Sequence, residues 1–454
     1  MKGISCRVKL TRAAVLVWIA LLVSVPVVGA QNFDENPYDV LEWNQIFIDM
    51  LIATNAANAS SPRLGAIVHT AIFDAYNGID RRYTPIFVNN EAPDRASRRA
   101  AVIAAAYTAL ASLFPSQKPA LDTSYAASLA ALTDNCDDAD QGSRRRGSCA
   151  RRIERIERGI AWGTDVAQAV LAWRGTDGFS ASYVPFNGGT AVGQWRPTPP
   201  LFGPMSSQGL AFTAMFVLDN STQYRPGPPR ALTSPTYTDD FNAVRVLGRD
   251  TGSARTVDQT ALAPFWEGNA SIHWNQAANQ MARANHLSMF DSNRLLAVLN
   301  IAMADTMSTT WSAKRFYGDV SFEVTWRPVT SIALADTDGN PHTLPEPGWL
   351  PLINTPSHPE YPAGHPSLNG AAATVLLSYF RRQQQTFTLT TTGQPSRTYN
   401  SIAQARSDGN NARILGGACT TRAQSLSAMQ WARRSPTTSI DTPCSGATRS
   451  DEDD

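Results

Sequence analysis

The chain has little charge, and neither sign is in excess. Charged residues make up 17% of its 454 residues, and 39 Lys and Arg against 38 Asp and Glu leave a formal net charge of +1. Binding to nucleic acid or to an anionic membrane surface depends on a local excess of positive charge. We therefore expect no nucleic acid partner and no electrostatic attachment to a membrane.

Long apolar runs are missing too, except near the N-terminus. There, four Lys and Arg residues precede the run AAVLVWIALLVSVPVV, and Val28-Gly29-Ala30 offers small residues for cleavage. We expect a signal peptide over residues 1–30, a mature chain that starts near Gln31, and a secreted or periplasmic protein without a stable membrane anchor. An uncleaved anchor is the alternative, but the run is short and Pro26 interrupts it.

Cysteine is scarce, with five residues in the whole chain. Cys6 leaves with the signal peptide, whereas Cys136 and Cys149 bracket the polar segment CDDADQGSRRRGSC. Because exported proteins fold in an oxidising compartment, we expect these two to form a disulfide that closes a small loop. Cys419 and Cys444 lie in the C-terminal tail, and the sequence assigns them no role.

Strand patterns are few, and helical spacing of apolar residues dominates the chain. The strand-like pieces are short, for example VSFEVTW and TFTLTTT. We predict an all-α protein of packed helical bundles over residues 31–417. It divides into an N-terminal half (about 31–175), a proline-rich crossover (about 175–235) and an active-site half (about 236–417). The tail, residues 418–454, is unlike the rest and is expected to be disordered.

Basic residues of the second half stand in unusual surroundings. Arg327 lies between Trp326 and Pro328, a frame that would fix its guanidinium for recognition of an oxyanion. Lys314 ends a helical pattern, and Arg413 lies between an Asn-rich turn and a Gly-Gly pair. The alternative for each is a purely structural role, as a solvated cation or as an arginine that ties down a loop.

The segment SHPEYPAGHPSLNGAAATVLLSYF joins a stiff turn to a strongly helical, apolar run. The free backbone N–H groups at such a junction favour anions, and Gly364 would let a ligand approach the backbone closely. His358 lies at the start of the turn, and His365 directly follows Gly364. The alternative is a proline-rich loop capped onto a core helix, with His365 as a structural residue.

The order K … W-R-P … H-P-E-Y-P-x-G-H … R-I-x-G-G resembles the vanadium-dependent haloperoxidases and the related phosphatidate and acid phosphatases. The segments SPRLGAIVHTAIFDAYNGI, GQWRPTPP and RTVDQTALAPFW are similar to the secreted bacterial branch related to vanadium chloroperoxidase. The resemblance covers roughly Trp43 to Gly417. It implies the helical-bundle fold of vanadium chloroperoxidase and type 2 acid phosphatases.

The resemblance also implies a site. Arg327 and Arg413 would clamp vanadate, Gly364 would offer its backbone N–H, His365 would be the acid–base residue, and Lys314 would be the pocket lysine. Vanadate would be the cofactor, with phosphate able to take the same place. The partners would be hydrogen peroxide and a halide or small organic substrate. The alternatives are an acid phosphatase acting on phosphomonoesters or lipid phosphates, and a catalytically impaired oxyanion-binding relative.

Three departures from the family pattern stand out. Ala363 replaces the usual serine before Gly-His, and the separation of Lys314 and Arg327 is longer than usual, which suggests an insertion around GDVSFE. No histidine follows Gly417, where the family has the residue that bonds vanadium. Read from the last base of the Ala418 codon, the gene could encode Met-His-Tyr there. A frameshift would therefore explain the tail, and natural divergence is the alternative.

Overall fold

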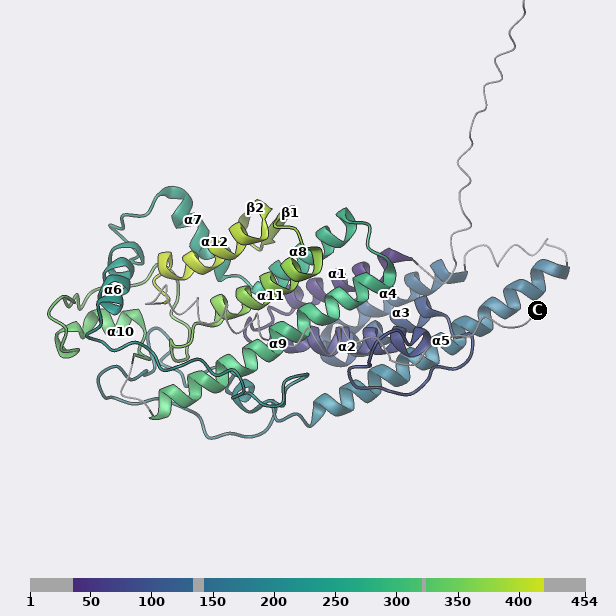
Figure 1. The fold of residues 1–454 in the computed structure, drawn as a ribbon, viewed down its shortest axis with the longest axis horizontal. Helices are drawn as coiled ribbons and strands as arrows, with labels where there is room; N and C mark the ends of the chain where they lie inside the picture. The colour runs from purple at the N-terminus through teal and green to yellow at the C-terminus, as the bar shows by residue number, and fades with distance from the viewer. Residues whose placement is uncertain (1–35, 134–142, 321–323, 420–454) are drawn as a thin grey trace, which may run out of the picture. The chain divides into compact units, whose positions relative to one another are not determined.

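Helices make up nearly all of the regular structure in the computed structural model, which describes residues 36–133, 143–320 and 324–419 (Figure 1). The mostly helical fold predicted from the sequence is confirmed. Within the described residues the α-helices are α1 (Pro37–Ala53), α2 (Ser61–Asp80), α3 (Arg98–Leu113), α4 (Lys118–Thr133), α5 (Ser143–Gly175), α6 (Pro235–Leu247), α7 (Val257–Glu267), α8 (Ala270–Ala284), α9 (Met289–Val320), α10 (Pro328–Ala333), α11 (Gly364–Phe380) and α12 (Ile402–Leu415).

The N-terminal half is built around α2. Most residues of this helix are buried, because α3, α5 and α9 all pack against it. A helix that is apolar on nearly every side is stable only when neighbours surround it. A short 3-10 helix, η1 (Pro115–Gln117), links α3 to α4.

The crossover between the halves is irregular, as its proline content predicts. Between Gly175 and Pro235 the structure has one short 3-10 helix, η2 (Gln208–Phe212). Buried charged side chains hold this segment in place. Arg174 donates to the carbonyls of Ala214 and Met215 at 2.6 and 3.2 Å. Asp305 on α9 accepts from three consecutive backbone N–H groups of the same segment, those of Phe216, Val217 and Leu218.

The second half places α11 between two other helices. It packs against α9 on one side and against α12 on the other, and Figure 1 shows the three running alongside one another. α7 packs against α12, and a further 3-10 helix, η3 (Ala335–Thr337), follows α10. The start of α11 is the junction that the sequence predicted as an anion site.

One hairpin departs from the all-helical prediction. Strands β1 (Gln384–Thr391) and β2 (Gln394–Ser401) pair antiparallel, with Phe387 opposite Tyr399. Both side chains are buried because β1 packs on α8 and β2 on α12. The strand-like piece TFTLTTT therefore lies in a strand. The described residues of VSFEVTW do not: Val320 ends α9, and residues 324–326 are irregular.

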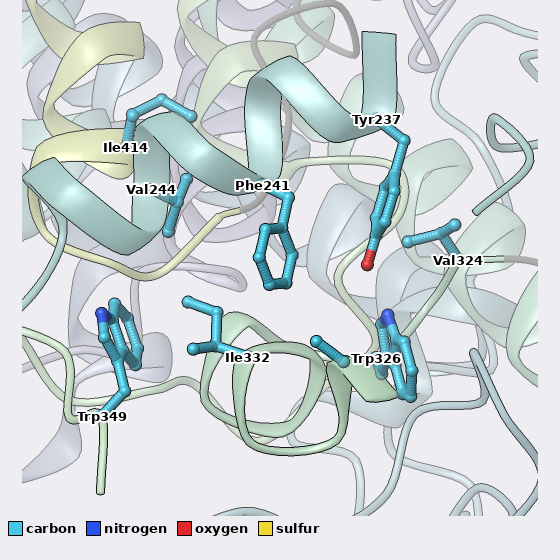
Figure 2. Packing of buried hydrophobic residues seen from close by; sticks show 9 residues of the cluster. Tyr237, Phe241, Val244, Val324, Trp326, Ile332, Trp349 and Ile414 are labelled. Atoms are coloured by element: carbon cyan, nitrogen blue, oxygen red, sulfur yellow. The ribbon is translucent and has the colours of Figure 1, made fainter. Parts of the chain in front are cut away.

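A hydrophobic cluster lies directly behind the two predicted clamp arginines. Trp326 precedes Arg327 and Ile414 follows Arg413, and both belong to this cluster (Figure 2). Its members are Tyr237, Phe241, Val244, Val324, Trp326, Ile332, Ala335, Trp349 and Ile414. Because these side chains are nearly inaccessible, they fix the backbone on which each arginine stands.

Several predictions fall outside the described residues. The signal peptide, Cys136 and the tail beyond residue 419 belong to this group. Cys149 is disulfide-bonded, and its expected pairing with Cys136 lies outside the described residues. From Asp34 onward the chain groups into one unit.

Among the described residues no single helix meets the length and hydropathy of a membrane span. One pair, Arg98–Leu113 with Pro115–Thr133, meets them jointly and is bent by 115°.

Candidate oxyanion site

One cavity of about 430 Å³ is lined by all five residues that the sequence singled out. They come from four separate places in the chain: Lys314 from α9, Arg327 from the start of α10, Gly364 and His365 from the start of α11, and Arg413 from α12. Trp311, Met307, Leu368 and Ala270 are among the residues that add an apolar wall. The cavity therefore combines cationic groups with apolar surface, as small-molecule sites commonly do.

The N-terminus of α11 opens on this cavity. Ala363 is the N-cap and gives no side-chain hydrogen bond to the helix, so the hydroxyl usual in the family is missing. Gly364 follows, and a side chain there would meet the Trp311 ring at 3.3 Å. A larger residue at this position would therefore press on the Trp311 ring, and Gly364 itself lines the cavity.

Lys314 and Arg327 already bind backbone carbonyls. The Lys314 ammonium donates to the Pro359 and Glu360 carbonyls at 2.6 and 2.9 Å. Arg327 donates from Nε to the His358 carbonyl at 2.8 Å and from Nη1 to the Ala418 carbonyl at 2.7 Å. Burial lowers the pKa of Arg327 to about 10, so it stays charged at neutral pH. Burial, with the nearby Arg327 charge, lowers the pKa of Lys314 well below its usual range.

Arg413 differs from these two residues. Its side chain is buried, and Nη1 has no hydrogen-bond partner among the described residues. Burial lowers the pKa of Arg413, whereas the neighbouring Cys419 and Glu267 raise it. A buried guanidinium donor without a partner is costly, and an anion in the cavity would satisfy it.

Two histidines line the cavity. His358 Nδ1 lies 2.7 Å from Arg327 Nη2, and the Trp311 ring stands 4.9 Å from the His358 ring. His358 Nδ1 also lies 3.0 Å from the Pro359 carbonyl, which only accepts, and Nε2 lies 3.3 Å from Arg327 Nη2. Because a guanidinium only donates, one ring nitrogen must accept from it while the other carries the proton, so the ring is neutral. Burial lowers the pKa of both His358 and His365 well below the usual range, and nearby cationic side chains lower each further. Both rings are therefore proton acceptors at neutral pH.

Cys419 lies two residues after Gly417, where the resemblance in the sequence predicted a histidine. Gly417 has a φ of +70°, which lets the chain turn back into the cavity after α12. The Cys419 side chain is buried and lines the cavity. Burial raises the pKa of this thiol to about 12, and the Glu360 carboxylate that accepts from it raises it too. Cys419 is therefore a neutral thiol at neutral pH.

The donor set fits a tetrahedral oxyanion better than it fits a coordinated metal. Arg413, the N-terminus of α11 and two neutral histidines could surround such an anion. Among the described residues no group of three or more His, Cys, Asp or Glu could hold a metal ion. A nitrogen ligand at position 419 is missing, so vanadate would be held by hydrogen bonds and charge alone.

Three residues of the cavity wall were missed by sequence reasoning. Glu360 lies within H-P-E-Y, and its charge next to a proline turn was a usable signal. Cys419 was noted only as part of the tail. Asn58 comes from the loop between α1 and α2, and its amide Nδ2 lies 2.9 Å from His365 Nε2. No local pattern marks Asn58, because its contact spans 307 positions in the sequence.

Comparison with known proteins identifies one domain and one fold. Residues 294–431 match the family model described as the VCPO second helical-bundle domain. This match continues past Gly417, where the resemblance in the sequence was expected to end. A search of the curated proteins finds no match to the chain.

Among solved structures, the fold is similar to that of bacterial vanadium-dependent enzymes. The first bacterial vanadium-dependent iodoperoxidase superimposes with a TM-score of 0.68 at 20% identity, over 87% of this chain and 94% of that chain. An apo-type bacterial vanadium-dependent chloroperoxidase gives 0.60 at 15% identity, over 82% and 93%. A holo-type bacterial vanadium-dependent chloroperoxidase gives 0.61 at 14% identity, over 89% and 93%.

Proposed function

We propose that this chain, which has the fold of the bacterial vanadium haloperoxidases and carries their second helical-bundle domain, is a haloperoxidase-like protein whose cavity binds vanadate or phosphate. One observation carries the proposal. The cavity gathers Lys314, Arg327, Gly364, His365 and Arg413, and the buried Arg413 Nη1 has no partner among the described residues. Such a group of donors is typical of an oxyanion site.

Each residue has a distinct part in this proposal. Arg413 offers its Nη1, which has no partner among the described residues, to the anion, and Gly364 adds a backbone N–H at the positive end of α11. Arg327 contributes charge, and Lys314 and Arg327 together hold the segment at 358–360 in place through its carbonyls. His365, neutral at rest, can take up a proton. Vanadate, when bound, would supply the Lewis acid that activates hydrogen peroxide toward a halide.

Cys419 limits the activity of the chain in this proposal. A neutral thiol is a poor ligand and a poor nucleophile, because both roles need the thiolate. The chain as it stands should therefore bind an oxyanion and turn over little. A histidine at this position could donate one ring N–H to the Glu360 carboxylate. Its other nitrogen would then be free to bond vanadium or to attack phosphorus.

The test compares the wild-type protein with Cys419→His and with Cys419→Ser as a matched control. Bromide-dependent halogenation of a phenol indicator by hydrogen peroxide is measured with and without added vanadate. Cys419→His should show vanadate-dependent halogenation at least tenfold above the wild type, whereas Cys419→Ser should stay at the wild-type level.

Two outcomes would change the assignment. Equal halogenation by all three proteins would mean that position 419 is not the missing ligand, and His358 would then be the first residue to substitute. Phosphate release from a phosphomonoester by Cys419→His without vanadate would move the assignment to an acid phosphatase, since the same donors fit phosphate.

Export is part of the same proposal, because the N-terminal segment has the charge and apolar pattern of a signal peptide. Cleavage after Ala30 would give a secreted or periplasmic protein. N-terminal sequencing of protein recovered outside the cytoplasm should begin near Gln31. An intact Met1 in membrane-bound protein would favour the uncleaved anchor instead.

A further inference from the structure

Asn58 connects the N-terminal half of the chain to the candidate oxyanion site. It lies in the loop between α1 and α2 and lines the same cavity as His365. Its side-chain amide makes three contacts with the second half. Nδ2 donates to the Gly268 carbonyl at 3.1 Å and lies 2.9 Å from His365 Nε2, and Oδ1 accepts from the Ala270 N–H at 3.3 Å.

The loop that carries Asn58 is itself held in place. Asn269, the N-cap of α8, donates to the Ala56 carbonyl at 3.2 Å and to the Ser61 hydroxyl at 2.7 Å. These two bonds fall on either side of Asn58 in the sequence. The side chain of Asn58 is thus presented to His365 from a loop that is fixed at both ends.

The two backbone partners decide which way the Asn58 amide faces. A carbonyl oxygen can only accept, so the atom beside Gly268 must be the NH₂ group. A backbone N–H can only donate, so the atom beside Ala270 must be the oxygen. The NH₂ group therefore also faces His365, and His365 Nε2 must accept from it. A neutral imidazole that accepts at Nε2 carries its proton on Nδ1.

We propose that Asn58 is a positioning residue that holds His365 in one orientation and in its neutral, Nδ1-protonated tautomer. Protonation at Nε2 would set an N–H group against the Asn58 NH₂ group, so the contact opposes the imidazolium form. The contact therefore occupies the Nε2 lone pair and keeps the ring neutral, with its proton on Nδ1. The importance of the His365 tautomer for catalysis rests on the proposed function. The tautomer itself can be tested without any assumption about function.

Other charged and titratable groups also act on His365. Burial lowers its pKa most, Arg413, His273 and Arg327 lower it further, and a hydrogen bond to the Gly268 carbonyl raises it. Glu267 lines the same cavity. These groups influence whether His365 is protonated. Asn58 contacts Nε2 directly. Its effect can therefore be told apart from that of the other groups by measuring which nitrogen of the neutral His365 ring carries the proton.

The test is ¹⁵N NMR of the full chain labelled at histidine, which reports the tautomer and the pKa of each imidazole without peroxide, halide or vanadate. The His365→Gln variant assigns the signal of His365. In the wild type, Nε2 should be unprotonated and Nδ1 protonated. Asn58→Ala should give a mixture of tautomers and a higher His365 pKa, by about one unit.

Asn58→Asp should reverse the preference, because a carboxylate accepts from Nε2–H and stabilises the imidazolium form. The exposed Asn90→Asp is the matched control and should leave the His365 signals unchanged. Circular dichroism confirms that each variant is folded. If Asn58→Asp does not fold, the His365 tautomer and pKa measured in Asn58→Ala still test the proposal. A wild-type His365 protonated on Nε2, or an unchanged tautomer in folded Asn58→Ala, would overturn the proposal.

Discussion

At the scale of the residue, charge alone does not tell which cationic side chain binds a ligand. Lys314 and Arg327 were predicted as members of an oxyanion clamp, and both line the cavity. Their donors, however, bind the carbonyls of residues 358–360 and 418, so an anion would compete with backbone groups there. Arg413 Nη1 faces no such competition among the described residues. Substitution of Arg327 would therefore disturb the wall of the cavity, whereas substitution of Arg413 would mainly remove a ligand contact. This difference makes Arg413 the residue on which binding should depend most.

At the scale of the element, the contact between α1 and α2 should make stability depend on pH. His69 on α2 is fully buried, and its Nε2 lies 2.9 Å from Asn44 Oδ1 on α1. Burial lowers the pKa of His69 to about 3, from 6.5 in the unfolded chain. Between the two pKa values, His69 is thus protonated in the unfolded state and neutral in the folded state. The stabilisation is complete above pH 6.5 and is lost as the pH falls, by about 2 kcal/mol between pH 6.5 and 5. In denaturant titrations over this range, the wild type should lose about that much more unfolding free energy than His69→Gln. Parallel curves for the two proteins would contradict this assignment.

At the scale of the whole molecule, sequence reasoning predicted the helical fold but missed the contacts between the two halves of the chain. The spacing of apolar residues predicted the helices, and proline content predicted the crossover, because both signals are local. The motif around His365 led to the cavity, since a glycine and a histidine at the start of a helix favour an anion site there. Asn58 could not be found in this way, because the fold alone brings it to His365. The hairpin of β1 and β2 was underestimated, because its burial comes from α8 and α12 rather than from its own pattern.

The most direct test of the central claim is a binding titration of phosphate and vanadate to the purified chain. Wild-type protein should bind both anions in competition with each other. Arg413→Gln should weaken binding by about ten- to a hundredfold, because a hydrogen bond from a charged donor contributes about 1.5–3 kcal/mol. Arg397→Gln is the control, since Arg397 pairs with the exposed Asp258 and does not belong to the cavity lining. Its affinity should equal that of the wild type. Equal affinities for wild type and folded Arg413→Gln, or no binding of either anion at millimolar concentration, would contradict the account.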